Sequence, residues 1–213
     1  MSAPEQETAI DKSPFGAIDD FLTDIRARTM EPLFVDLGCG QSVPPPDFVG
    51  ADLYATGDRI VRADLFGGVW PWLDGSVDAF TSSHFLEHVP DWNHHWSEAY
   101  RCLKPGGFYR FVGPYAKSDR YLQDPTHCQP LHENKIWYLS QEWRRANRIE
   151  HYYSEFNFSR HALAFAYHRD YAFPNGKLKV SDEATEYART HYWNVVDDIF
   201  VVMKKEPLIE VAP

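Results

Sequence analysis

The sequence predicts an α/β fold in which a mostly parallel sheet carries helices on both faces. Short apolar segments alternate with segments of helical spacing, and a glycine turn directly follows the first apolar segment. The chain has 213 residues, 44% of them hydrophobic, which is enough for one sizeable core. We expect a flexible tail at 1–13 and a single domain at 14–207, with a substrate-side insertion around 114–190.

Five short apolar segments in the first half of the chain are predicted to be strands, at 33–37, 47–53, 59–63, 77–81 and 108–112. Helical spacing of apolar residues predicts helices at 15–28 and 92–103. The proline and two glycines in 104–107 are expected to end the second helix.

The last third of the chain does not continue this alternation of short strands and helices. We expect a helix at 136–149 with a solvated basic face made by Arg144, Arg145 and Arg148, and a strand that begins near 156. A helix at 182–188 and a strand at 195–205 complete the prediction.

Charge and cysteine content exclude several classes of protein. The 21 Lys and Arg against 31 Asp and Glu give a net charge of −10, which argues against a general nucleic-acid binder. The apolar runs are too short for a transmembrane span, and the polar start does not fit a secretory signal. Three scattered cysteines favour the cytoplasm over a disulfide framework. The oligomeric state is not fixed.

The glycine turn is the first candidate for a binding site. Asp36 precedes Gly38 and Gly40, and glycine lets a ligand lie against bare peptide groups. Three prolines at 44–46 exclude a full helix, so we predict a shortened first crossover. A phosphate needs a helix N-terminus, whereas a sulfonium amino acid does not. The turn therefore favours S-adenosylmethionine over a dinucleotide.

Two more acids follow the next predicted strands. Asp52 ends the second strand, where a carboxylate can bind both ribose hydroxyls. Asp64 follows the third strand and can accept a hydrogen bond from an adenine amino group, although a single acid there is also a common loop cap. Three acids at successive strand ends indicate a shared site.

With these motifs in place, the chain resembles the class I S-adenosylmethionine-dependent methyltransferases, and most closely a group of small bacterial and phage-type proteins. The resemblance covers most of 33–205, in the segments VDLGCGQS (35–42), VGADLY (49–54), RADLF (62–66), DGSVDAFTSSHFLEHVPDW (74–92), CLKPGGFYRFVGPY (102–115), DPTHCQPLHE (124–133) and HYWNVVDDIFVVMKK (191–205).

The resemblance implies a Rossmann-like, seven-stranded sheet whose last strand is antiparallel, with S-adenosylmethionine as cofactor. It places the turn of Gly38, Cys39 and Gly40 under the methionine, with Asp36 near the amino group. Asp52 would hold the ribose, Asp64 with Leu65 would hold the adenine, and Leu53 is a further cofactor-binding residue. Ser82, Ser83 and His84 would line the wall near the sulfonium. The third glycine of the longer fingerprint is replaced by Ser42.

The segment from His84 to His88 supports a rival interpretation. It matches H-x-x-E-H, in which two helical histidines bind zinc and Glu87 is the base of a hydrolase. Because the same segment sits inside an ordered methyltransferase series, we expect no metal ligands here. His94 and His95 are expected to face solvent.

Titratable residues in the loop after the fifth strand are candidates for catalysis. A protonated acceptor needs a base, and histidine titrates near neutrality. We hypothesise that His127 takes the proton and Asp124 orients it, with His84 or His88 as the second choice; a structural loop is the alternative. The expected acceptor is a small molecule, with oxygen, nitrogen and carbon all open. An inactive binding module stays possible, although the intact acids argue against it.

Overall fold

The computed structural model describes residues 22–27, 29–54, 56–153, 155–172, 179 and 181–210. The predicted tail at 1–13 and the first part of the predicted helix at 15–28 lie outside these residues. Residues 22–27 are helical, as expected.

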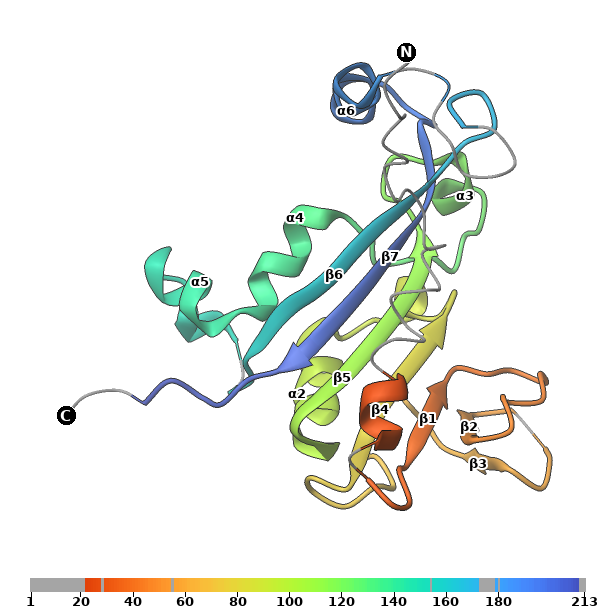
Figure 1. Ribbon diagram of the computed structural model, residues 1–213, viewed down its shortest axis with the longest axis vertical. Helices are drawn as coiled ribbons and strands as arrows, with labels where there is room; N and C mark the ends of the chain where they lie inside the picture. Colours follow the sequence, from red (N-terminus) through yellow and green to blue (C-terminus); the bar gives the residue numbers. More distant parts are fainter. Residues whose placement is uncertain are drawn as a thin grey trace, which may run out of the picture.

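A seven-stranded sheet forms the centre of the molecule (Figure 1). Its strands are β1 (Phe34–Leu37), β2 (Phe48–Asp52), β3 (Ile60–Arg62), β4 (Val77–Ser83), β5 (Leu103–Pro114), β6 (Phe158–Tyr167) and β7 (Val196–Lys205). They lie in the order β3-β2-β1-β4-β5-β7-β6. β7 pairs antiparallel with both β5 and β6, whereas the pairs from β3 to β5 are parallel. The predicted sheet is confirmed.

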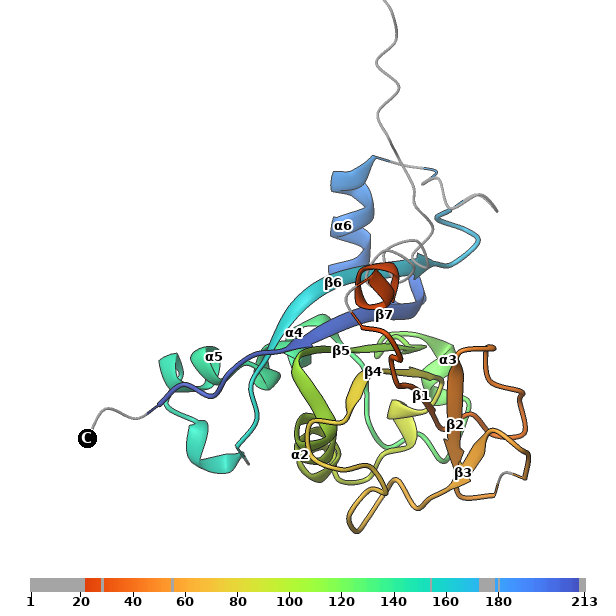
Figure 2. The same ribbon diagram turned by 60° about the horizontal axis from the view of Figure 1, so that its bottom comes forward.

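Helices cover both faces of this sheet, also as predicted (Figure 2). On one face, α2 (Trp92–Cys102) places the buried Trp96 in the same core cluster as Val35 and Leu37 of β1. On the other face, Leu22 and Ile25 belong to a second buried cluster with side chains of the strands. Since successive strand residues point to opposite faces, β1 supplies both clusters.

The first crossover contains no helix in residues 38–47, which confirms the predicted shortening. Arg59 stabilises this extended segment because its guanidinium donates to the carbonyls of Pro44, Pro45 and Pro46 at 3.0, 2.8 and 2.9 Å. The prolines lack N–H groups, but their carbonyls are thus paired.

Two elements differ from the prediction. β5 begins at Leu103, directly after α2, and a shift in its pairing with β4 accommodates 104–107. The predicted helix at 136–149 is broken into α4 (Glu133–Ile136), a 3-10 turn (Trp137–Leu139) and α5 (Gln141–Ala146). Ser140 is extended there, and its hydroxyl accepts from the Trp143 N–H. An N-cap therefore interrupts the helical pattern.

The remaining helical segments of the described residues are two α-helices and two 3-10 turns. α3 (Asp119–Leu122) and α6 (Asp182–His191) lie toward the carboxyl end of β5 (Figure 1). Single 3-10 turns span Leu86–His88 and Glu150–Tyr152. None of the described helices has both the length and the apolar character that crossing a bilayer requires.

Candidate active site

A glycine turn joins β1 to the extended crossover. Gly38 and Gly40 have φ angles of +68° and +58°, in the left-handed region that side chains disfavour. The N–H groups of Gly38 and Cys39 both donate to the carbonyl of Ala51 on β2, at 2.8 and 3.3 Å. A Cβ on Gly38 would lie 2.2 Å from the ring of Phe85, whereas one on Gly40 would meet nothing within 4 Å. The turn therefore has no room for a side chain at Gly38, whereas the space around Gly40 is open.

Asp52 ties the end of β2 to this turn. Its carboxylate accepts hydrogen bonds from the N–H groups of Gly40, at 3.0 Å, and Tyr54, at 2.9 Å. Asp64 follows β3 and accepts from the N–H of Phe66 at 2.9 Å. Because β1, β2 and β3 are adjacent and parallel, both acids stand at the same edge of the sheet.

Asp36 lies one residue before the end of β1 and is partly buried. Burial raises its pKa to about 6, and the charge of Arg110 on β5 partly opposes this shift. Burial also raises the pKa of the Cys39 thiol to about 11, and the charges of Asp36 and Asp52 add to the effect. The carboxylates of Asp36 and Asp52 therefore both raise the pKa of Cys39 in the glycine turn.

The end of β4 holds two serines in different surroundings. Ser82 is fully buried, and its hydroxyl accepts from Tyr109, whose own oxygen contacts Nε2 of His95 at 2.9 Å. Ser83 is exposed at the end of the strand. The expectation that His95 faces solvent is wrong, because His95 is fully buried and burial lowers its pKa to about 3.

His84 follows β4 in a left-handed conformation with a φ of +51°. Its N–H donates to Val112 on β5 at 2.9 Å, and its Nδ1 lies 3.4 Å from Oε1 of Glu87. The contact with Glu87 raises the pKa of His84. Only Leu86–His88 form a helical turn, so His84 and His88 do not share a helix. The H-x-x-E-H geometry of a helical zinc site is absent from this described segment.

The loop after β5 folds back onto that turn. The N–H groups of Cys128 and Gln129 both donate to the carbonyl of Glu87, at 2.8 and 2.9 Å. This brings the His127 ring to 4.7 Å from the ring of His88. Asp124 lies beside them, its Oδ2 being 3.9 Å from Nε2 of His127. All four catalytic candidates thus lie at the ends of β4 and β5.

Comparison with known proteins identifies the fold. Residues 47–111 match a family model described as a methyltransferase domain. A SAM-dependent methyltransferase from Archaeoglobus fulgidus superposes with a TM-score of 0.52 and 16% identity, over 91% of this chain and 95% of that one. A putative methyltransferase from Bacillus halodurans gives 0.51 and 16%, over 90% and 100%. A geranyl diphosphate methyltransferase in complex with SAM gives 0.51 and 15%, over 89% and 84%. The chain thus has the fold of the SAM-dependent methyltransferases, and residues 47–111 match a methyltransferase domain. No curated protein sequence matches it.

Proteins with this fold use S-adenosylmethionine (SAM), and the edge of the sheet that holds Asp52 and Asp64 offers groups suited to it. The open face of Gly40 leaves bare peptide groups for a ligand, and the Asp52 carboxylate stands next to them. Leu53 is partly exposed beside Asp52, whereas Leu65 is buried beside Asp64. Most predicted cofactor residues lie at this edge, but Ser82 points into the core.

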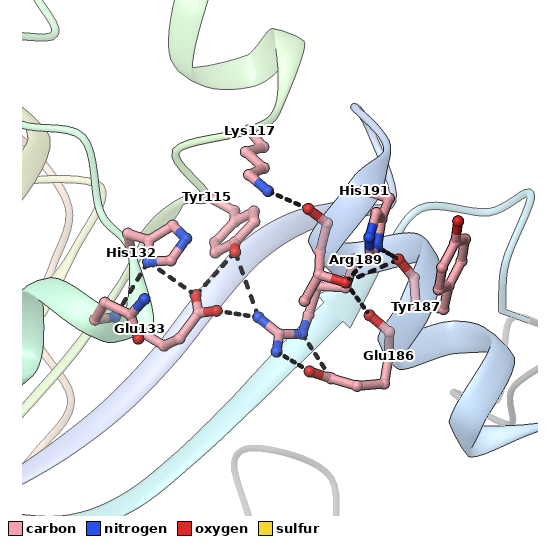
Figure 3. Close-up of polar contacts among 10 residues, drawn as sticks. Tyr115, Lys117, His132, Glu133, Glu186, Tyr187, Arg189 and His191 are labelled. Carbon is pink, nitrogen blue, oxygen red and sulfur yellow. Dashed lines mark hydrogen bonds and ion pairs between the residues drawn. The ribbon is translucent and has the colours of Figure 1, made fainter.

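An ion-pair network lies beyond the carboxyl end of β5 and joins it to α4 and α6 (Figure 3). Arg189 on α6 pairs with Glu133 on α4 and with Glu186, and Tyr115 after β5 donates to Glu133 at 2.8 Å. Lys117 donates to the carbonyl of Thr190 at 2.8 Å. These contacts hold α6 against the end of β5. Sequence reasoning missed the network because its contacts between elements join residues 18 to 74 positions apart.

The predicted basic face has a structural role. Arg144 is buried, and its guanidinium donates to the carbonyls of Tyr138 and Phe156 at 2.8 and 2.6 Å. Arg145 pairs with Glu150 at 2.9 Å. The expectation that Arg144 is solvated is therefore wrong. Its guanidinium is buried and donates hydrogen bonds to two backbone carbonyls.

Proposed function

We propose that this methyltransferase moves a methyl group from SAM to an oxygen or nitrogen atom of a small-molecule acceptor. The observation that carries the proposal is the hydrogen bond from Gly40 to Asp52 at 3.0 Å, which sets a carboxylate beside an open glycine turn. Methyl transfer from a sulfonium mainly requires that nucleophile, methyl and sulfur be aligned where water is scarce.

For the cofactor, each group of SAM has a proposed partner. The diol of the ribose would donate to Asp52, whose orientation is fixed by the N–H groups of Gly40 and Tyr54. The methionine part would lie over Gly38, Cys39 and Gly40, with Asp36 near its ammonium. The adenine would lie beside Asp64 and Leu65. Ser83 and His84 would border the sulfonium.

For the acceptor, His84 is the favoured contact residue. Its side chain is 42% exposed, whereas that of His127 is 9% exposed and its Nδ1 is bonded to the carbonyl of Tyr121 at 2.7 Å. Asp124 is bonded to Thr126. We therefore assign acceptor contact and proton removal to His84, and place His88, Asp124 and His127 in the wall behind it.

A small acceptor is supported by two observations. The net charge of −10 does not favour a polyanion such as RNA. One structural neighbour is named for geranyl diphosphate, a small molecule. The chemistry of the wall, which is made of imidazoles and carboxylates, suits an acceptor with an ionisable hydroxyl or amine.

The test is methyl transfer from methyl-tritiated SAM to a mixture that holds a metabolite extract, RNA and protein. We expect label in the small-molecule fraction, and none with Asp52→Ala. Label in RNA or protein would refute the acceptor class. Binding of SAM with no transfer to any fraction would favour the inactive binding module.

His84→Gln tests the acceptor assignment. Turnover should fall at least about tenfold, the low side of an acid–base contribution, while the Kd for SAM stays unchanged. Unchanged turnover would remove His84 from catalysis.

A further inference from the structure

Three side chains behind His84 form a cluster that the proposed methyl transfer does not by itself require. One carboxylate oxygen of Glu87 and one ring nitrogen each of His88 and His127 lie within 4.8 Å of one another. Glu87 and His88 come from the turn after β4, and His127 comes from the loop after β5. The two backbone hydrogen bonds to the Glu87 carbonyl hold these segments together.

The hydrogen bonds fix which nitrogen of each ring carries the proton. Nδ1 of His127 lies 2.7 Å from the carbonyl of Tyr121, which can only accept, so the proton is on Nδ1. The Thr126 hydroxyl donates its proton to Asp124 at 2.6 Å and must therefore accept from Nδ1 of His88 at 2.9 Å. In both rings the Nε2 lone pair remains. In metal-binding histidines the other ring nitrogen likewise donates to a fixed acceptor, which here is a carbonyl for His127 and the Thr126 hydroxyl for His88.

Glu87 supplies the negative charge. Its side chain is 1% exposed, and within the described residues neither carboxylate oxygen accepts a hydrogen bond of good geometry. Gly113 of β5 permits this position, because a Cβ there would lie 2.9 Å from Oε2 of Glu87. The nearest donor to this buried carboxylate is Nδ1 of His84, at the long distance of 3.4 Å, and a buried carboxylate held so weakly is costly unless a cation pairs with it.

We propose that Glu87, His88 and His127 bind a divalent first-row transition-metal ion at the acceptor side of the cofactor edge. Two imidazoles and one carboxylate suit Zn²⁺, Fe²⁺, Co²⁺ or Mn²⁺ better than Mg²⁺ or Ca²⁺, which prefer oxygen ligands. Three protein ligands leave coordination positions for an oxygen or nitrogen of the acceptor, and the ion would make that group more acidic. The site rests on geometry alone and does not depend on the proposed acceptor.

The site differs from the zinc motif that the sequence suggests. H-x-x-E-H would use His84 and His88 as ligands and Glu87 as base. In the structure His127 takes the place of His84, and Glu87 is a ligand.

Metal binding to the full chain, freed of metal with a chelator, tests the proposal. We expect Zn²⁺ to bind once per chain in isothermal titration calorimetry, and Co²⁺ to give visible d–d absorption. His88→Ala and His127→Ala should each weaken binding at least tenfold. His191→Ala, which removes an exposed histidine of α6, should leave it unchanged.

Equal Zn²⁺ binding in all four proteins, or none in wild type, would overturn the site. If an alanine variant does not fold, Thr126→Val decides, because it removes the hydroxyl that accepts from Nδ1 of His88 and leaves all three proposed ligands in place. We expect a loss of about tenfold in Zn²⁺ affinity from it, and unchanged affinity would contradict the proposal. SAM binding is measured in parallel, so that failure of the metal site and failure of the methyltransferase assignment are told apart.

Discussion

At the scale of single residues, the glycine turn is constrained in two ways. The left-handed backbone of Gly38 disfavours any side chain, and the ring of Phe85 occupies the place of a Cβ. Gly40 has the first constraint only. A comparison of substitutions at Gly38 and Gly40 therefore separates the cost of backbone strain from the cost of steric overlap.

Gly38→Ala should lower the free energy of unfolding by about 2 to 5 kcal/mol, the sum of the strain and the overlap. Gly40→Ala, the matched control, should lower it by about 1 to 2 kcal/mol. Urea unfolding of both variants measures the difference. Equal losses would mean that Phe85 moves away at little cost.

Asp36 gives a pH dependence of stability. Its pKa is about 6 in the folded state, against 3.8 for an unperturbed aspartate, because burial disfavours the carboxylate. Protonated Asp36 thus stabilises the folded state below about pH 4, and this contribution is lost as the pH rises through 6. The Asp36→Asn variant should not show this loss of stability as the pH rises.

Between pH 4 and pH 7, the free energy of unfolding of wild type relative to Asp36→Asn should fall by about 2 to 3 kcal/mol, since one pKa unit corresponds to about 1.4 kcal/mol. Urea unfolding at both pH values gives this number. A difference that stays constant with pH would show that Asp36 titrates normally.

At the scale of elements, α6 depends on one buried ion pair. Arg189 and Glu133 have side chains only 10% and 16% exposed, and Tyr115 completes their network (Figure 3). Removing Glu133 is costly because Arg189 then keeps only the more exposed Glu186 as a charged partner.

Glu133→Gln should therefore loosen α6. We expect the α6 amides to exchange with solvent about ten- to a hundredfold faster, which corresponds to about 1 to 3 kcal/mol, while the β1 amides keep their protection. Hydrogen exchange followed by mass spectrometry measures both. Glu142→Gln, an exposed substitution on α5, serves as the control; equal exchange of α6 in the two variants would show that the pair does not hold the helix.

At the scale of the whole molecule, periodicity and turn residues predict the sheet well. The parallel strands β1 and β2 are mostly buried apolar runs, and the prolines at 44–46 exclude a crossover helix by simple stereochemistry. The edge acids follow from where those strands end. The fold and the position of these acids at one edge of the sheet could therefore be predicted from the sequence.

Other features depend on tertiary contacts that no local pattern contains. His95 is buried because Tyr109 offers it a partner across the core, and Arg144 is buried because two carbonyls accept from it. Residues 87 and 127 meet only because the loop after β5 returns to the Glu87 carbonyl. The periodicity of the sequence does not predict such long-range contacts.

The central claim is that the glycine turn and Asp52 together hold SAM. The most direct test is isothermal titration calorimetry of SAM with wild type and with Asp52→Ala, each shown to be folded by circular dichroism. Wild type should bind one SAM per chain, and Asp52→Ala should bind it at least about tenfold more weakly, because a ribose diol loses a charged acceptor. Equal affinity in the two proteins, or no binding by wild type, would contradict the account.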